Sequence, residues 1–124
     1  MGYRSEVILC VGNEVMPQFL TTLAKCPEAR ELCFKHTDEM IKDYDGTGNL
    51  LFRWDYIKWY QGYDPIDALS DFMDWCDGEE IEVDGDSQEA AYFFRFVRVG
   101  EEMEDSVVRG YGFEDVGIER RISH

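Results

Sequence analysis

Residues 40–60, MIKDYDGTGNLLFRWDYIKWY, decide how the rest of this chain can fold. From residue 49 onward, two sets of side chains alternate along the chain: Leu50, Phe52, Trp54 and Tyr56 against Leu51, Arg53 and Asp55. This alternation is typical of a β-strand, and the preceding Asp45-Gly46-Thr47-Gly48 is typical of a turn. We therefore predict a β-hairpin with strands at 40–44 and 49–60.

Strand and helix patterns flank this hairpin on both sides. Upstream, the apolar run 3–11 predicts a strand that is buried on both faces at its far end, and helical patterns follow it. Downstream, Asp64 as N-cap and Pro65 at the first helical position open a clear helix that ends at Gly78. The apolar stripe of this helix consists of Ile66, Leu69, Phe72, Met73 and Cys76. The remaining segments are an acidic loop at 79–89 with Gly85 in a turn, a buried strand at 91–99 and a last strand at 106–111.

This order of elements predicts an α+β fold. Strand, helix, strand, strand, helix and strand make up the ferredoxin-like split β-α-β sandwich, with an antiparallel sheet and an additional C-terminal strand. We expect a single domain over 1–124, long enough to bury a core. The side chains expected in its interior are Val7, Leu9, Leu69, Met73, Phe94 or Phe96, and Val97. The four cysteines, Cys10, Cys26, Cys33 and Cys76, have no CxxC spacing, so we expect reduced and mostly buried thiols.

Charge is the most unusual property of the chain. The formal net charge is −15, and residues 64–89 hold eleven carboxylates with no lysine or arginine. Like charges at this density repel, by about 0.2–0.5 kcal/mol for each i,i+4 pair on a helix. The acidic balance argues against direct binding of nucleic acid or anionic lipid, because phosphate recognition needs clustered Lys and Arg. No apolar run reaches the roughly 18 residues that a membrane span needs.

The acidic helix is the first candidate site. Asp67, Asp71 and Asp74 are spaced to lie on the face opposite the apolar stripe, with no cation nearby in the sequence. Successive carboxylates at this spacing lie about 6 Å apart, close to the phosphate spacing of a nucleic-acid strand. The competing interpretation is the solvated face of an acidic protein. The acidic residues that we select for partner binding are Asp64, Asp67, Asp71, Asp74, Asp77, Glu79, Glu80 and Glu82.

Aromatic residues next to the acidic helix are the second candidate. Trp59, Tyr60 and Tyr63 lie between the long strand and the helix, where we expect an exposed anchor for a protein interface. The other aromatic residues of the strands are expected to pack in the core.

Three further functions have weak support. Asp43 to Leu50 matches the first half of a calcium-binding EF-hand loop, but its twelfth position is Trp54 instead of a bidentate glutamate. Cys26, Cys33 and His36 have a spacing that fits no common zinc module. No catalytic motif is present, so we expect no enzyme and no cofactor.

Three patches of sequence carry a resemblance. They are Gly2-Tyr3-Arg4-Ser5-Glu6-Val7, then Ile57-Lys58-Trp59-Tyr60 followed by Tyr63-Asp64-Pro65, and finally 94–101, FRFVRVGE. In this order they resemble a family of small, acidic, mostly uncharacterised proteins of tailed phages and prophages. The resemblance implies a phage origin and assigns no functional residue.

Together, charge and resemblance favour a non-enzymatic binding protein of phage origin. We expect an inhibitor of a host defence or nucleic-acid-handling protein, of the anti-CRISPR or DNA-mimic type, acting in the cytoplasm of a bacterial host. Its partner would be a basic host protein or a nucleoprotein complex, and the chain would be a monomer or homodimer. The alternatives are an accessory or structural phage protein, acidic only for solubility, and a small calcium- or metal-binding protein.

Overall fold

The computed structural model describes residues 4–44, 48–102 and 105–113. The strands are β1 (Ser5–Val11), β2 (Glu39–Tyr44), β3 (Asn49–Ile57), β4 (Glu80–Val83), β5 (Asp86–Glu89), β6 (Phe94–Gly100) and β7 (Ser106–Arg109). The helices are α1 (Met16–Lys25), α2 (Pro27–Phe34) and α3 (Asp64–Gly78), with short 3₁₀ turns at η1 (Asn13–Val15) and η2 (Ala90–Phe93).

Five strands form one antiparallel sheet in the order β2-β3-β1-β6-β7. The helical crossover through α1 and α2 joins β1 to β2, and β3 lies between these two strands. This is the split β-α-β arrangement, so the predicted α+β fold with its antiparallel sheet is confirmed. The additional C-terminal strand is confirmed as β7, which lies at the edge beside β6.

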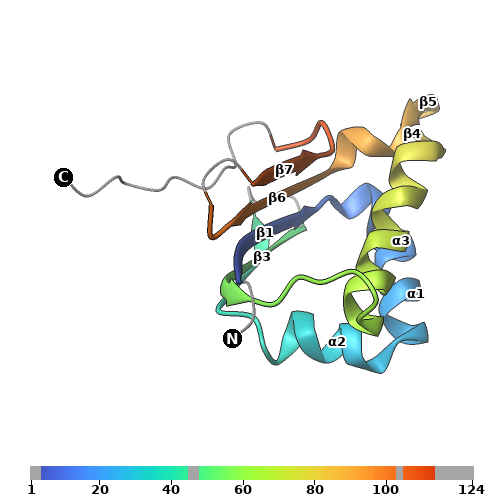
Figure 1. Cartoon of the computed structure of the whole chain (residues 1–124). Coiled ribbons are helices and arrows are strands. Elements are labelled where there is room, and N and C mark those ends of the chain that lie inside the picture. Colours follow the sequence, from blue (N-terminus) through green and yellow to red (C-terminus); the bar gives the residue numbers. More distant parts are fainter. Residues whose placement is uncertain (1–3, 45–47, 103–104, 114–124) are drawn as a thin grey trace.

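The three helices cover one face of the sheet (Figure 1). Between the two layers lies the main core, to which β1 contributes Val7, Leu9 and Val11, and α3 contributes Leu69 and Met73. All side chains predicted for the interior are buried: Val7, Leu9, Leu69, Met73, Phe94, Phe96 and Val97. All of them except Val97 belong to the main core, whereas Val97 pairs with Ile8 and so lies on the other face of the sheet.

The other face of the sheet carries a smaller apolar cluster. Ile8 and Cys10 of β1 and Leu51 of β3 are buried there, and Phe113 packs against them. The register pairs Cys10 with Leu51 and Ile8 with Arg53, so the cluster runs across two strands. The prediction that the first strand is buried on both faces at its far end is confirmed.

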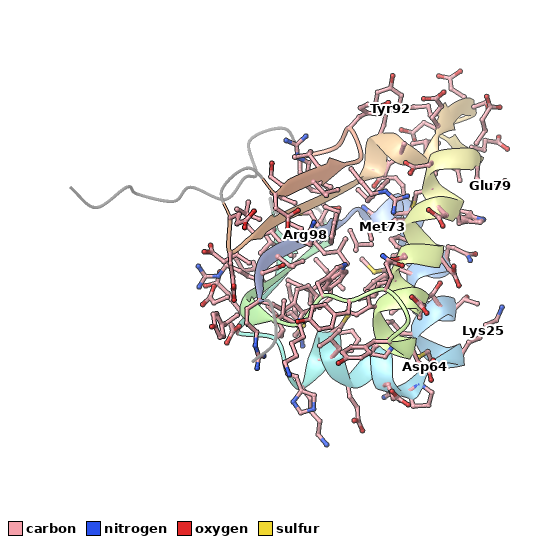
Figure 2. All side chains as sticks on the ribbon, viewed as in Figure 1. Lys25, Asp64, Met73, Glu79, Tyr92 and Arg98 are labelled. Atoms are coloured by element: carbon pink, nitrogen blue, oxygen red, sulfur yellow. The ribbon has the colours of Figure 1, made fainter. Side chains whose placement is uncertain are left out.

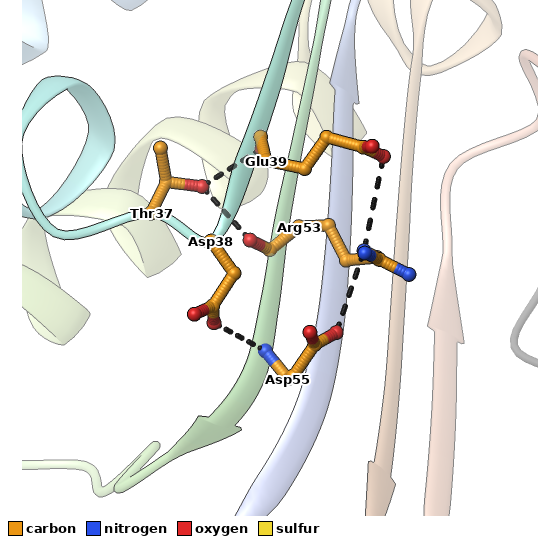
Figure 3. A network of polar contacts seen from close by, with 5 residues as sticks. All are labelled: Thr37, Asp38, Glu39, Arg53 and Asp55. Atoms are coloured by element: carbon orange, nitrogen blue, oxygen red, sulfur yellow. Dashed lines mark hydrogen bonds and ion pairs between the residues drawn. The ribbon is translucent and has the colours of Figure 1, made fainter.

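The predicted hairpin forms from β2 and β3, and a polar network holds its open end (Figure 3). The Thr37 hydroxyl donates to the carbonyl oxygens of Glu39 and Arg53, at 2.9 and 2.8 Å. A carboxylate oxygen of Asp38 accepts the backbone N–H of Asp55 at 2.7 Å. The Arg53 Nε lies 3.4 Å from Asp55 and 3.8 Å from Glu39. These contacts tie the chain entering β2 to the middle of β3. The predicted turn residues 45–47 lie outside the described residues.

Several element boundaries differ from the predictions; the last strand, for example, ends at Arg109 instead of Tyr111. The second hairpin strand ends at Ile57 instead of Tyr60, because the chain leaves the sheet toward α3. The helix begins at Asp64 itself, with Tyr63 as its N-cap, and Tyr63 supplies the carbonyl that accepts the Asp67 N–H at 2.8 Å. The strand expected from Ala91 begins only at Phe94, because Ala90–Phe93 form a 3₁₀ turn.

The segment predicted as an acidic loop is a β-hairpin. β4 and β5 pair in register around Asp84 and Gly85. Both turn residues have positive φ, 52° and 86°, as the type I′ hairpin turn requires. The predicted turn at Gly85 is confirmed. The prediction of a loop on both sides of it was wrong, because carboxylates have low β propensity and the alternation of Ile81 and Val83 with acids was not recognised as a strand.

All four cysteines are free, and they differ in accessibility. Cys10, Cys33 and Cys76 are buried, whereas Cys26 is half-buried. Burial raises the pKa of Cys33 to about 12. Burial, with a further increase from the nearby Asp77 charge, raises the pKa of Cys76 to about 12.

We predict that Ellman's reagent at neutral pH reacts rapidly with one thiol of the native protein, that of Cys26. Cys33 and Cys76 lack both access and thiolate, which is the reacting form, and Cys10 lacks access. The measurement is the number of fast-reacting thiols before and after unfolding, with the labelled cysteine located by mass spectrometry. The variant Cys26→Ser should lose the fast phase. Labelling of Cys33 or Cys76 at the rate of Cys26 would contradict the assignment.

Candidate acidic interaction surface

Helix α3 presents its carboxylates by burying its other face. Ile66, Leu69, Phe72, Met73 and Cys76 are all buried under the sheet-facing side of the helix. Figure 2 shows Met73 on the side facing the sheet, with Asp64 at one end of the helix and Glu79 just beyond the other. Asp64, Asp71 and Asp74 are exposed on the opposite side, as the helical period predicts.

Asp67 has a structural contact at the start of this helix. One of its carboxylate oxygens accepts the backbone N–H of Gly62 at 2.9 Å, and its side chain is half-buried. Gly62 lies just before the N-cap Tyr63, so the contact holds the chain entering the helix. Asp67 is therefore less suitable than Asp71 as a purely surface-exposed acid.

Arg109 provides the counter-charge that residues 64–89 themselves lack. Its Nη2 lies 2.8 Å from Asp74 Oδ1 and 2.6 Å from Asp77 Oδ2, which come from the last two turns of α3. Burial alone lowers the pKa of the Arg109 guanidinium, but the hydrogen bonds and charges of Asp77 and Asp74 outweigh burial and leave this pKa raised. The expectation that the acids have no nearby counter-charge was wrong for these two, because β7 brings in a cation from a distant part of the sequence.

The β4–β5 hairpin extends the acidic surface beyond the helix. Its register places Glu80 directly opposite Glu89, and Glu82 opposite Ser87. Opposed like charges on neighbouring strands are destabilising. The Ser87 hydroxyl donates a hydrogen bond to Glu80 at 3.1 Å. The hairpin therefore keeps a repulsive pair of glutamates on its surface.

We define the acidic surface by the exposed carboxylates of α3 and the hairpin that have no ion pair among the described residues. They are Asp64, Asp71, Glu79, Glu80, Glu82, Asp84, Asp86 and Glu89. Five of the eight acids predicted for partner binding, Asp64, Asp71, Glu79, Glu80 and Glu82, belong to it. The other three have contacts of their own: Asp67 holds Gly62, and Asp74 and Asp77 bind Arg109.

The three aromatic residues predicted as an exposed anchor lie in different environments. Trp59 is half-buried and packs against the core, with its ring centroid 5.8 Å from that of Trp54 and 5.3 Å from that of Phe96. Tyr60 and Tyr63 contact each other, with ring centroids 5.6 Å apart, and Tyr63 is 47% exposed. Tyr63 is thus the most accessible of the three.

A second exposed aromatic pair was not predicted. Tyr92 and Tyr111 are 54% and 62% exposed, and their ring centroids lie 5.4 Å apart. Tyr92 follows the acidic hairpin directly, within η2. The sequence placed Tyr92 in a buried strand, and only the 3₁₀ turn at Ala90–Phe93 directs its side chain outward. The sequence pattern alone therefore does not distinguish these two tyrosines from the aromatic residues of the core.

Residues 45–47 of the calcium-loop pattern lie outside the described residues. Trp54, at the closing position of the calcium-loop pattern, is 1% exposed and donates its indole N–H to the Leu32 carbonyl at 3.1 Å. Cys33 is fully buried, whereas His36 is exposed. Within the described part of the chain, no three His, Cys, Asp or Glu side chains are placed to hold a metal ion together.

In the same residues, no helix has the length and apolar character needed to cross a membrane. Comparisons of this chain with protein-family models, with curated proteins and with solved structures gave no match.

Proposed function

We propose that this chain is a non-enzymatic binding protein whose acidic surface engages a basic surface of another protein. The observation that carries the proposal is the set of exposed acids with no ion pair among the described residues, including the opposed Glu80 and Glu89. An ordinary solvated surface mixes charges of both signs. A cationic partner would relieve the repulsion that this surface maintains in the free protein.

The mechanism follows from the arrangement of charge and aromatic rings. An extended negative field accelerates encounter with a basic partner, and the acceleration falls as salt screens it. Exposed rings beside the acids, Tyr63 near the start of α3 and Tyr92 after the hairpin, would provide buried contacts that slow dissociation. Association rate and residence time would thus depend on different residues.

The biological role that we propose is inhibition of a host defence or nucleic-acid-handling protein by a protein of phage origin. Two observations support it: the acidic surface, which suits a groove built for nucleic acid, and the resemblance of the three sequence patches to acidic phage proteins. The inhibitor would act as a DNA mimic, by competition for the basic groove. An accessory phage protein that is acidic only for solubility is the competing candidate.

The test is a charge reversal on the acidic surface. The variant Asp71→Lys/Glu79→Lys/Glu82→Lys changes three exposed acids that have no ion pair among the described residues, so the fold should persist. Immobilised parent and variant would capture proteins from a bacterial lysate at about 50 mM and about 500 mM salt, with added duplex DNA as competitor. We expect a basic partner that the parent retains only at low salt, that DNA displaces and that the variant fails to capture.

The matched control is Glu14→Lys/Glu28→Lys/Glu31→Lys, which changes the net charge equally but on the segments of η1 and α2. The control should retain the partner. If the control loses the partner and the acidic-surface variant keeps it, or if no salt-sensitive partner distinguishes the two, the proposed function is wrong and the acids serve solubility.

A further inference from the structure

A hollow of about 590 Å³ opens where the ends of several elements meet. Its charged and apolar lining includes Asp77 from α3, Glu89 from β5, Arg95 from β6, Val108 and Arg109 from β7, and Tyr111. The acidic surface lies beside this hollow, yet two arginines contribute to its wall.

The backbone around the hollow is held by specific contacts. The Tyr111 N–H donates to the Ala91 carbonyl at 2.8 Å, and the Gly112 N–H donates to the Phe94 carbonyl at 3.1 Å. Gly110 has φ +85°, and a Cβ at this position would collide with the Phe94 carbonyl oxygen. Only glycine therefore fits, and the turn after β7 places the Tyr111 ring against Tyr92. The wall is thus formed before any ligand binds.

Arg95 has an unsatisfied polar atom in this wall. Its Nε is buried without a hydrogen-bond partner, and it is the one buried side-chain polar atom of this kind in the described part of the chain. Arg95 also forms no ion pair with a described residue. Leaving a buried donor unpaired is unfavourable, and more so when the group is charged. An acceptor that reaches Nε would remove this cost.

The charges next to Arg95 limit which kind of anion can bind to it. Arg109 is already engaged by Asp74 and Asp77, so Arg95 is the cation that remains for a ligand. Glu89 is exposed in the same lining and repels anions, a dianion more than a monoanion. A carboxylate therefore fits better than a phosphate. Val108 and Tyr111, 54% and 62% exposed, offer apolar surface next to it.

We propose that this hollow binds a carboxylate that carries an aromatic or apolar group, with the Arg95 guanidinium as its charge partner. An arginine and a carboxylate form paired N–H···O bonds, and the ring of the ligand would lie against Tyr111. The carboxylate can belong to a free organic acid or to the C-terminal residue of a polypeptide. This site does not depend on the proposed function. The ligand would bind to the Arg95 guanidinium, whereas the proposed function relies on the carboxylates of the acidic surface.

The probe is N-acetyl-phenylalanine, which mimics a C-terminal aromatic residue. Titration of the ¹⁵N-labelled full chain should shift the backbone amide signals of Arg95, Val108 and Tyr111 in a saturable manner. N-acetyl-phenylalaninamide, which lacks the carboxylate, should bind at least about tenfold more weakly, since a charge-assisted pair is lost. Phenyl phosphate should also bind more weakly than N-acetyl-phenylalanine, because of Glu89.

Variants separate the site from general charge effects. Arg95→Gln should lower the affinity for N-acetyl-phenylalanine at least about tenfold, while Arg53→Gln, which removes an equal charge from β3, should leave it unchanged. Glu89→Gln should strengthen binding of phenyl phosphate more than binding of N-acetyl-phenylalanine. The amide spectrum of each variant reports whether the fold is retained.

Two further ligands identify the source of the carboxylate. If benzoate binds as well as N-acetyl-phenylalanine, the ligand class is a free organic acid. If a tetrapeptide ending in phenylalanine binds more tightly than both, the ligand class is the C-terminus of a polypeptide. Either result supports the site. The proposal is overturned if no probe gives a saturable shift, if the carboxamide binds equally well, or if folded Arg95→Gln keeps the parental affinity.

Discussion

Replacing Phe72 by alanine should lower the free energy of unfolding by about 3–5 kcal/mol. Phe72 is 1% exposed and connects α3 both to a neighbouring helix and to the sheet. Its ring centroid lies 5.2 Å from that of Phe19 on α1 and 6.3 Å from that of Phe94 on β6, both in edge-to-face geometry. The substitution removes apolar burial and both ring contacts, and it leaves a cavity that the rigid layers cannot close.

The measurement is equilibrium unfolding in urea, followed by the fluorescence of the tryptophans. Because domains of this size are stable by about 5–15 kcal/mol, the variant should lose a large share of its stability. Phe72→Leu should lose much less, since it keeps most of the volume. The control Tyr92→Ala removes an aromatic ring that is 54% exposed, and its cost should stay below about 1 kcal/mol. Equal losses in Phe72→Ala and Tyr92→Ala would show that Phe72 does not connect the layers.

Replacing Arg109 by methionine should destabilise the protein by about 1–2 kcal/mol, less than the upper range for charged hydrogen bonds because the acids are partly exposed. Arg109 is the cation that contacts both Asp74 and Asp77, at 2.8 and 2.6 Å. Without it these two acids face each other and the rest of the acidic surface with no counter-charge. Added salt should then recover part of the loss, since it screens the repulsion between exposed carboxylates.

The comparison for Arg109 is Arg30→Met, which removes an exposed arginine of α2 that forms no ion pair among the described residues. Its unfolding free energy should change by less than about 0.5 kcal/mol. In a double-mutant cycle, Asp74→Asn/Asp77→Asn should cost little in the Arg109→Met background, because the interaction is already absent. A fully additive cycle would show that the three side chains do not act together.

The fold was predictable because its information is local. The alternation of Leu50, Phe52 and Trp54 is visible in five consecutive residues, and the helical stripe of α3 in fifteen. Each period determines which side chains share a face of a helix or strand. The apolar faces of the helices and the sheet then pack against each other to form the core. In the β4–β5 hairpin the turn at Gly85 was predictable, but its strands were not, because only Ile81 and Val83 alternate with acids and carboxylates have low β propensity.

The candidate site was predictable in part. Its helical acids were recognisable from spacing alone, and Asp64, Asp71, Glu79, Glu80 and Glu82 stay exposed without an ion pair among described residues. The environment of Trp59 was not recognisable, since the same aromatic residue can face solvent or, as here, pack on Trp54 and Phe96. Arg95 carried no sequence signal at all, because the burial of its Nε arises only in the folded chain.

By itself, the sequence determined the type of most elements, the residues of the core and the sign of the charge on α3, since each of these depends on neighbours along the chain. Tertiary structure decided which charges meet. Asp74 and Arg109 are separated by 35 residues, and their contact requires both the placement of α3 on the sheet and the register that sets Arg109 opposite Phe96. Local periodicity specifies neither the placement of the helix nor the register of the strands. Which acids form ion pairs is therefore known only from the folded structure.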